Sequence, residues 1–344
     1  MNYPQKYQRC LVMSGGGFRF GYYLGIYAAM REQGRTPDLL LASCGAAIAA
    51  GIIQHFSDDV ERKEWLCSPE MYRFWQGMRS SRQATIGRAL AGALRRGFSI
   101  RYAHQIPDLF NDYMFDIPEM LPTPTTAPAN RETAVAIIAG KLLFSESEVG
   151  QRRAGRKLFA ETVFGEHRTA ALLQGMRSPV SAEIWGDSAI SAELLTDVSM
   201  PIEQAARASV SDMIYFRCHT YQDQHYIGGV IDLFPIEIAH QLADQVFMEL
   251  KGPYDKIFSV PALRTVLGIN GNQRLQHVLR QRADLWVDTS DMERILAGNQ
   301  ITKKMSWREN RIELVLSESY DAYVKMIEAQ WQYGFQRGLS AFAR

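Results

Sequence analysis

Three consecutive glycines follow a short apolar segment near the start of the chain, in MSGGGFRFGYYLG at residues 13–25. A backbone without side chains at the end of a strand permits either a turn too sharp for a Cβ atom or the close approach of another group to the main chain. Amides in such a turn serve two chemistries, phosphate binding and oxyanion stabilisation. The surrounding spacing decides between them.

Phosphate binding is disfavoured by that spacing. A dinucleotide motif, Gly-x-Gly-x-x-Gly, counted from Gly15 places Phe20 at the third glycine, where helix and strand must pack closely. No Gly-Lys-Ser/Thr follows, so the triphosphate-binding loop is disfavoured as well. The oxyanion interpretation instead requires a nucleophile on another strand-to-helix turn.

Composition excludes few classes of function. The 344 residues include 38 Lys+Arg and 37 Asp+Glu, a balance that does not indicate a nucleic-acid partner. The four cysteines, at positions 10, 44, 67 and 218, have no metal-type spacing, so we expect reduced thiols and no metal site. No apolar run of signal-peptide length precedes the glycines and none of membrane-spanning length follows, which predicts a soluble, cytoplasmic protein.

Alternating strand and helix patterns predict an α/β fold with a mainly parallel sheet. Residues 8–13 are expected to form a buried strand and residues 21–34 a helix, followed by a second strand ending near residue 43 and a second helix rich in small residues. Two such units in succession are typical of the start of a parallel sheet. Further strands are expected at 133–140, 181–186, 225–231, 244–250 and 284–289.

We expect one domain over residues 1–344, with a helical cap inserted at 57–128 and a C-terminal helical extension at 291–344. The cap ends at a linker-like stretch, PTPTTAPAN. Its segment TIGRALAGALRRGFSIR (85–101) carries apolar residues at four-residue intervals among arginines. This pattern predicts a helix packed on the core, with a membrane-surface helix as the alternative. The apolar positions are Ile86, Leu90, Leu94 and Phe98, and the arginines are Arg88, Arg95, Arg96 and Arg101.

A candidate nucleophile lies on the second strand-to-helix turn, in LLLASCGAAIAAG at 39–51. Ser43 precedes Gly45 by two residues, as in the nucleophile elbow Gly-x-Ser-x-Gly, although Leu41 stands at the first glycine position. A serine that only caps the second helix is the alternative. Cys44 could also be considered as a nucleophile, but the residue after an elbow serine donates its amide to the oxyanion, so we expect that role for Cys44.

These turns and two later segments resemble the patatin-like phospholipases. The family's Gly-Gly-Gly-x-Arg/Lys turn is similar to residues 15–19, and its Pro-Asp strand with serine elbow is similar to residues 37–46. The segment IEQAARASVSDMIYF (202–216) is similar to the family's Ala-x-Arg-Ala-Ser stretch. The segment YIGGVIDLFPIEIA (226–239) resembles its Asp-Gly-Gly segment.

The resemblance implies a three-layer sandwich with helices on both faces of the sheet, and a Ser-Asp dyad that hydrolyses an ester of a lipid or lysophospholipid. It also implies no need for a cofactor or metal. Transient contact with a membrane surface is a further option, which the arginine-rich segment at 85–101 leaves open. Ser43 would attack the carbonyl, and an aspartate would serve as general base. The remaining implied roles are an oxyanion hole of Gly15, Gly16, Gly17 and Cys44, with support from Arg19 and Gly45.

The chain differs from the family pattern at the position of the catalytic aspartate. Ile227 occupies the position of the family's aspartate, and isoleucine cannot accept a proton. The acid could be displaced, with Asp232 on the loop before a proline as our candidate and Asp223 as a second one; His219 and His225 are further possible bases. Alternatively, the protein is a slow hydrolase that uses its oxyanion hole alone, or a non-catalytic relative that binds acyl chains or a protein partner in the same cleft.

Overall fold

The computed structural model describes residues 4–98, 104–122, 124 and 128–343. Part of the expected linker and Arg101 of the arginine-rich stripe lie outside the described residues. In the described part of the chain, no helix combines the length and apolarity needed to cross a membrane.

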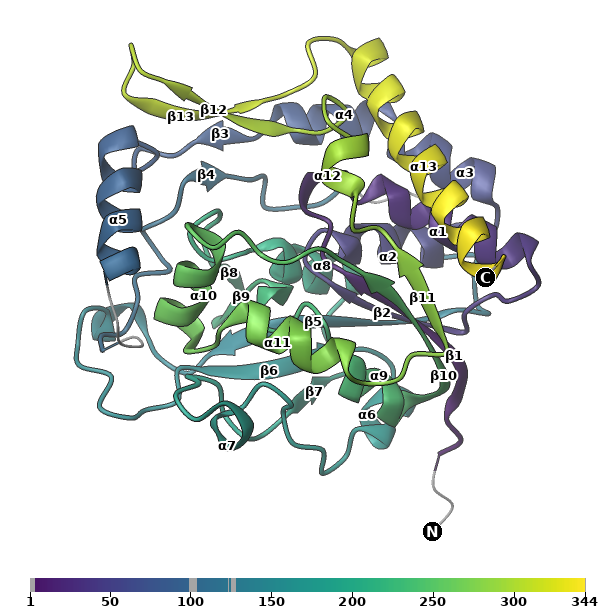
Figure 1. The fold of residues 1–344 in the computed structure, drawn as a ribbon, viewed down its shortest axis with the longest axis horizontal. Coiled ribbons are helices and arrows are strands. Elements are labelled where there is room, and N and C mark those ends of the chain that lie inside the picture. Colours follow the sequence, from purple (N-terminus) through teal and green to yellow (C-terminus); the bar gives the residue numbers. More distant parts are fainter. Residues whose placement is uncertain (1–3, 99–103, 123, 125–127, 344) are drawn as a thin grey trace.

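A nine-stranded, mainly parallel sheet forms the centre of the molecule (Figure 1). Its main path runs β11-β10-β1-β2-β5-β6-β7, and the β8–β9 hairpin pairs with β5. Neighbours from β11 to β5 are parallel, whereas β6 and β9 run antiparallel to β5. The strands are β1 (Tyr7–Ser14), β2 (Leu39–Ser43), β5 (Ala134–Leu142), β6 (Phe159–Phe164), β7 (Leu195–Asp197), β8 (His219–Tyr221), β9 (Gln224–Ile227), β10 (Ala243–Leu250) and β11 (Leu285–Asp288).

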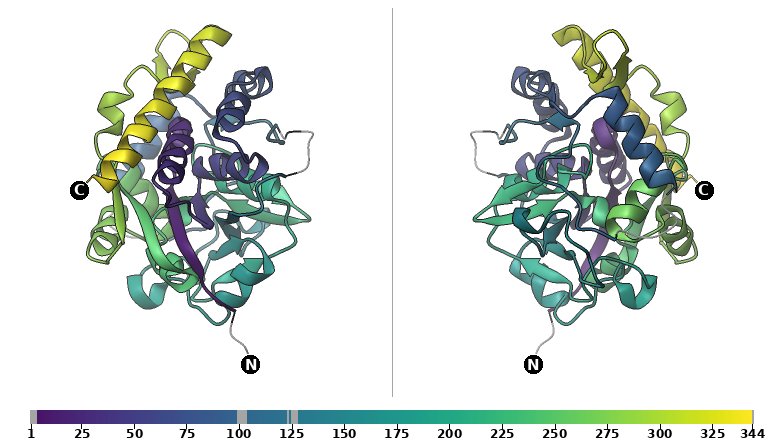
Figure 2. Two further views of the ribbon diagram at one scale, coloured as in Figure 1. Left: turned by 90° about the vertical axis from the view of Figure 1, so that its right-hand side faces the viewer. Right: turned by 90° about the vertical axis from the view of Figure 1, so that its left-hand side faces the viewer.

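Helices cover both faces of the sheet because the central strands are apolar on both sides. In β2, Leu40 and Ala42 belong to one buried cluster, while Leu39 and Leu41 belong to the other. Figure 2 shows the resulting layers edge-on. The first cluster includes residues of α1 (Gly21–Glu32), α2 (Ala46–His55), α8 (Ile202–Val210) and α13 (Tyr320–Phe342); the second includes residues of α6 (His167–Leu172), α9 (Ile236–Leu242), α10 (Ser259–Leu267) and α11 (Gly271–Leu279).

The α/β class, the mainly parallel sheet and the helices after the first two strands are confirmed. The strand expected at 181–186 is wrong, because Ala182–Trp185 forms the short helix α7. Strands β6 and β7 were not predicted. Strand β6 is buried along its whole length, so its sequence FAETVF lacks the alternation that identifies a half-exposed strand.

The segment 57–128 contains α3 (Asp59–Leu66), α4 (Pro69–Gln76), β3 (Arg79–Ser80), α5 (Ile86–Phe98) and β4 (Phe115–Asp116). Trp75 of α4 packs against two aromatic residues of the glycine turn, with ring centroids 6.1 Å from Phe18 and 5.2 Å from Phe20. This layer therefore lies against the turn that the glycines form.

The segment 291–344 is not wholly helical. It contains α12 (Met292–Ile295), an antiparallel hairpin of β12 (Thr302–Ser306) and β13 (Arg311–Val315), and then α13. Helix α13 lies directly on α1: a Cβ atom on Gly334 would be 1.8 Å from the carbonyl oxygen of Tyr22. Only glycine permits this approach, so the C-terminal helix is an integral part of one layer.

Candidate active site

The second strand-to-helix turn places Cys44 at its tip. Strand β2 ends at Ser43, helix α2 begins at Ala46, and Cys44 between them has φ +56°. A positive φ is uncommon for a residue other than glycine, and such strain is concentrated at functional turns. Cys44 keeps 7% of its surface exposed, whereas Ser43 keeps none.

Ser43 continues the alternation of β2 and therefore faces the same helical layer as Leu39 and Leu41. Its hydroxyl donates a hydrogen bond to the main-chain oxygen of Asp232, at 3.0 Å. We expected this hydroxyl to face the amides of the glycine turn and an acid side chain. The hydroxyl instead connects β2 to the loop that contains Asp232 through this hydrogen bond.

The thiol of Cys44 is paired with a carboxylate. Its Sγ lies 2.8 Å from Oδ2 of Asp212 and donates to it. The amide of Val230 lies 3.4 Å from the other oxygen, Oδ1. A nucleophile and an acid–base group are thus within hydrogen-bond distance at the turn, which is the arrangement that covalent catalysis requires.

Electrostatics keeps the proton on the thiol in the resting site. Burial, followed by the charge of Asp212, raises the pKa of the Cys44 thiol well above its usual range, and the amide of Gly45 opposes that rise. Burial raises the pKa of Asp212 to about 7. At neutral pH a substantial fraction of the carboxyl group is therefore ionised and able to accept a proton, which suits a general base.

Two residues of the Ala-x-Arg-Ala-Ser stretch hold this arrangement in place. Ser209 accepts a hydrogen bond from the Cys44 amide at 2.8 Å and donates one to the carbonyl of Ile138 on β5 at 2.6 Å. Arg207 donates to the hydroxyl of Ser211 at 2.6 Å, beside Asp212. The motif therefore ties the elbow, β5 and the acid together.

The backbone after the acid is strained as well. Ile214, two residues beyond Asp212, has φ +73°, which is exceptional for a β-branched residue. The carbonyl of Asp212 accepts a hydrogen bond from the amide of Phe216 at 2.9 Å, which closes the turn. Such local strain persists only where the surroundings fix it, and it is concentrated at functional sites.

The glycine turn contacts the elbow through main-chain atoms. Gly15, Gly16 and Gly17 have φ values of +84°, +95° and +57°, so the turn requires the conformational freedom of glycine. A Cβ atom on Gly45 would lie 2.4 Å from the carbonyl oxygen of Gly17. The two turns can therefore meet only because position 45 has no side chain.

Two of the four expected oxyanion-hole amides are already engaged. The Gly15 amide donates to the carbonyl of Ser43 at 3.1 Å, and the Cys44 amide donates to Ser209. Arg19 lies beside the turn, with Nη2 3.7 Å from Glu293 and a buried Nε that has no hydrogen-bond partner among the described residues. Support of the turn by Arg19 therefore stays a prediction.

A buried polar cluster beneath the glycine turn was not foreseen from the sequence. Lys251, just after β10, donates to the carbonyl of Ser14 and lies 3.4 Å from the carboxylate of Glu249. Glu249 also accepts hydrogen bonds from Tyr22, at 2.6 Å, and from Tyr23. The ammonium group therefore holds the end of β1 where the glycines begin.

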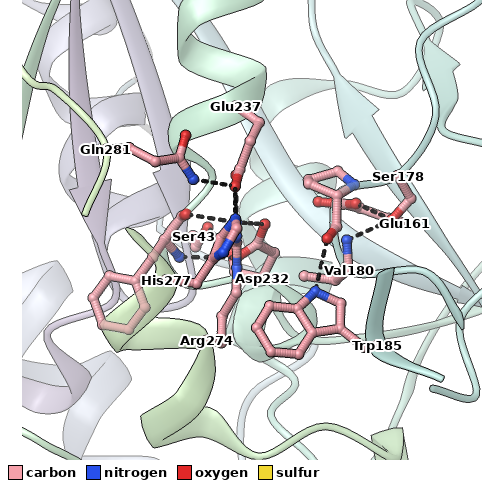
Figure 3. A network of polar contacts seen from close by, with 12 residues as sticks. Ser43, Glu161, Ser178, Val180, Trp185, Asp232, Glu237, Arg274, His277 and Gln281 are labelled. Carbon is pink, nitrogen blue, oxygen red and sulfur yellow. Dashed lines mark hydrogen bonds and ion pairs between the residues drawn. The ribbon is translucent and has the colours of Figure 1, made fainter. Parts of the chain in front are cut away.

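The predicted pairing of Ser43 with the Asp232 side chain is corrected by the structure (Figure 3). Asp232 presents only its main-chain oxygen to Ser43 in their hydrogen bond, while its carboxylate forms an ion pair with Arg274 at 2.9 Å. Arg274 also makes a two-pronged contact with Glu237, at 2.7 and 2.6 Å. The Asp232 carboxylate is thus committed to a buried ion-pair network behind the elbow.

Glu161, whose pKa is affected by burial and by the charges of Asp232 and Arg274, is a further acid with an unusual pKa. Burial, followed by the charge of Asp232, raises the pKa of Glu161 to about 8. One oxygen of Glu161 accepts a hydrogen bond from Ser178, and the other has no partner among the residues that the structure describes.

The residue at the family's acid position and two of the other candidates for the base have structural roles. Ile227 is fully buried in the second cluster. His219 is hydrogen-bonded to Gln204 at 2.9 Å, and burial lowers its pKa to about 4. Asp223 has φ +61° in the β8–β9 turn, which is ordinary turn chemistry for aspartate.

A signal for Cys44 is present in the sequence but is easily overlooked. An elbow centred on Ser43 finds Leu41 at the first small-residue position, whereas an elbow centred on Cys44 finds Ala42 and Ala46 at both. The turn needs small residues at these positions because neighbouring backbones approach it closely. Asp212 has no comparable signal in the sequence, because the resemblance of its segment to the family rests on Arg207 and Ser209 and not on Asp212.

Together these features define an α/β protein with a strained strand-to-helix turn, carrying a thiol–carboxylate pair, at the carboxyl edge of a mainly parallel sheet. The chain belongs to the patatin-like phospholipase family, whose sequence profile matches residues 11–240. Among solved structures, VipD from Legionella pneumophila is similar over 98% of this chain and 67% of its own, with 10% sequence identity and a TM-score of 0.38. No curated protein matches the chain.

Proposed function

We propose that the protein is an acyl hydrolase that uses the thiol of Cys44 as its nucleophile and Asp212 as its general base. The observation that carries this proposal is the 2.8 Å contact from Sγ to Oδ2, made by the residue with positive φ at the tip of the elbow. Family membership supports a lipid as the source of the acyl group. This assignment replaces the Ser43–Asp232 pair that we expected from the sequence.

The chemistry proceeds in two balanced steps. Asp212 accepts the thiol proton as Sγ adds to the acyl carbonyl; the tetrahedral intermediate then releases its leaving group, which takes the proton, and the acyl group remains on sulfur. Water next gives a proton to Asp212 and adds to the thioester. Collapse expels the sulfur of Cys44, which recovers the proton, and releases the carboxylic acid.

Backbone amides would stabilise the oxyanion in both steps. We assign this role to the amide of Gly45, which follows the nucleophile at the start of α2, and to Gly16 and Gly17 of the glycine turn. The partial positive charge at the N-terminus of α2 acts in the same direction. Gly15 then serves to hold the turn, because its amide is bound to Ser43.

An apolar pocket beside α2 suits an acyl chain. It is lined by residues of α2 and α8 and by the proline-rich segment of the cap, including Ala47, Ile48, Gly51, Ile52 and Ala206. It begins one helical turn beyond Cys44 on α2. We propose that the acyl chain of the substrate binds there.

The test is hydrolysis of p-nitrophenyl octanoate, whose leaving group departs readily from any nucleophile. Cys44→Ala should abolish turnover and the octanoyl adduct seen by intact-protein mass spectrometry. Ser43→Ala, the adjacent control, should retain both. Loss of activity in Ser43→Ala with retention in Cys44→Ala would reject the thiol mechanism, and no turnover by the wild-type protein would favour the binding-protein alternative.

A further inference from the structure

We propose that the substrate of this site is an acyl thioester rather than the oxygen ester of a phospholipid. The inference rests on the function proposed above, and it concerns which bond the elbow is suited to break. It follows from the presence of sulfur, not oxygen, at the tip of the elbow and from the placement of the proton donors around it.

Two leaving groups compete when a thiol attacks an oxygen ester. When a thiol adds to an oxygen ester, the intermediate can expel either the enzyme's thiolate or the substrate's alkoxide. An ordinary thiol has a pKa of about 8.5, whereas the hydroxyl of an alcohol, like that of water, is a far weaker acid. The thiolate therefore leaves far more readily, and the oxygen ester is returned unchanged. With a thioester, two similar thiolates compete, and the forward reaction needs no special assistance.

The proton donors near Cys44 are already engaged. Cleavage of an oxygen ester through sulfur requires an acid that protonates the departing oxygen before the sulfur leaves. The Asp212 carboxylate is bound to Sγ through Oδ2 and lies on the sulfur side of the site, held by the Val230 amide. The Lys251 ammonium is committed to the Ser14 carbonyl and to Glu249. Asp212 is thus engaged with the nucleophile and Lys251 with the main chain and Glu249, so neither is a free acid for a leaving oxygen.

A thioester needs only the groups that are present. Asp212 takes the proton of Cys44, Sγ forms a bond to the acyl carbon, and the bond from that carbon to the substrate's sulfur breaks. The thiolate departs without direct protonation, and the proton on Asp212 passes to solvent and from solvent to the thiolate. Water then hydrolyses the acyl-Cys44 intermediate with the same carboxylate as base, so one thioester and one water give one carboxylic acid and one thiol.

The test compares two substrates that differ in one atom, S-octanoyl-1-thioglycerol and 1-octanoylglycerol. We expect the wild-type kcat/KM to be at least about tenfold higher for the thioester, although hydroxide attacks the two classes at similar rates. Cys44→Ser should lower that ratio by at least about tenfold, because an oxygen nucleophile no longer leaves in preference to the alkoxide. Thermal melting of each variant verifies that it is folded.

The outcomes separate this inference from the function on which it rests. Equal or faster cleavage of 1-octanoylglycerol that depends on Cys44 would overturn the thioester inference and leave the thiol hydrolase intact. Cleavage of p-nitrophenyl octanoate without cleavage of the thioester would do the same. Failure of all three substrates, or their cleavage independently of Cys44, would overturn both.

Discussion

The carboxylate of Asp212 lies where a side chain at Gly228 would otherwise be. A Cβ atom on Gly228 would lie 2.1 Å from Oδ1 of Asp212, so the acid fills the volume that a side chain at position 228 would need. In the family's Asp-Gly-Gly segment an acid precedes the glycines, whereas here Asp212, from another segment of the chain, places a carboxylate beside Gly228. The charge is present near the elbow although the sequence position that normally carries it holds Ile227.

Removing Asp212 should therefore leave a space that a small carboxylate can occupy. We expect Asp212→Ala to lower kcat/KM on p-nitrophenyl octanoate by about 10²- to 10⁴-fold. Added formate should restore part of the activity, because it fits the vacated space and accepts the same proton. Asp212→Asn is the matched control: it removes the base but leaves no space, so formate should have no effect. Equal rescue of both variants would contradict the role of Asp212.

The pH dependence of the reaction should report the same carboxylate. Because burial raises the pKa of Asp212 to about 7, its basic form is populated above that pH and lost below it. We expect kcat/KM to rise about tenfold per pH unit below this value and to level off above it. A profile on p-nitrophenyl octanoate from about pH 5 to about 9 would measure this. A profile that is already flat from pH 5 would exclude Asp212 as the base.

The fold could be predicted from the sequence to a useful degree, because apolar strands and small-residue helices alternate regularly around Gly15–Gly17 and Ser43. The site could be located but not assigned. Which of two adjacent residues carries the positive φ depends on where β2 ends, and periodicity cannot fix a boundary to one residue. Asp212 and Cys44 are 168 positions apart, and only the packing of α8 against α2 and β5 brings them together.

The same burial should make Asp212 a cost to stability. Its pKa rises from about 3.9 in the unfolded chain to about 7 in the fold, so between these values the folded state binds more protons and stability falls as pH rises. Asp212→Asn cannot ionise and should be stabilised relative to wild type by ~1–3 kcal/mol above pH 7. Near pH 4 the two proteins should unfold alike.

Denaturant unfolding at several pH values measures this difference. The exposed Asp223 provides the control, since Asp223→Asn makes the same chemical change in a solvated turn and should follow the wild-type pH dependence. A stability gain in Asp212→Asn that is equal at pH 4 and pH 8 would indicate a packing effect and contradict the ionisation argument.

Arg274 should matter for folding far more than for chemistry. Its side chain is 5% exposed and pairs with Asp232, which is 0% exposed, and with Glu237. Arg274→Met would leave two carboxylates without their partner, and removing one member of a buried ion pair typically costs about 3–5 kcal/mol. Combining it with Asp232→Asn removes one unpaired charge and should recover part of the loss, a coupling that a double-mutant cycle in urea measures.

Because the Asp232 carboxylate is not the base for Cys44 in our mechanism, an Asp232→Asn variant that remains folded should retain most of its activity. Loss of turnover in a folded Asp232→Asn variant would return the acid to Asp232 and overturn the pairing with Asp212.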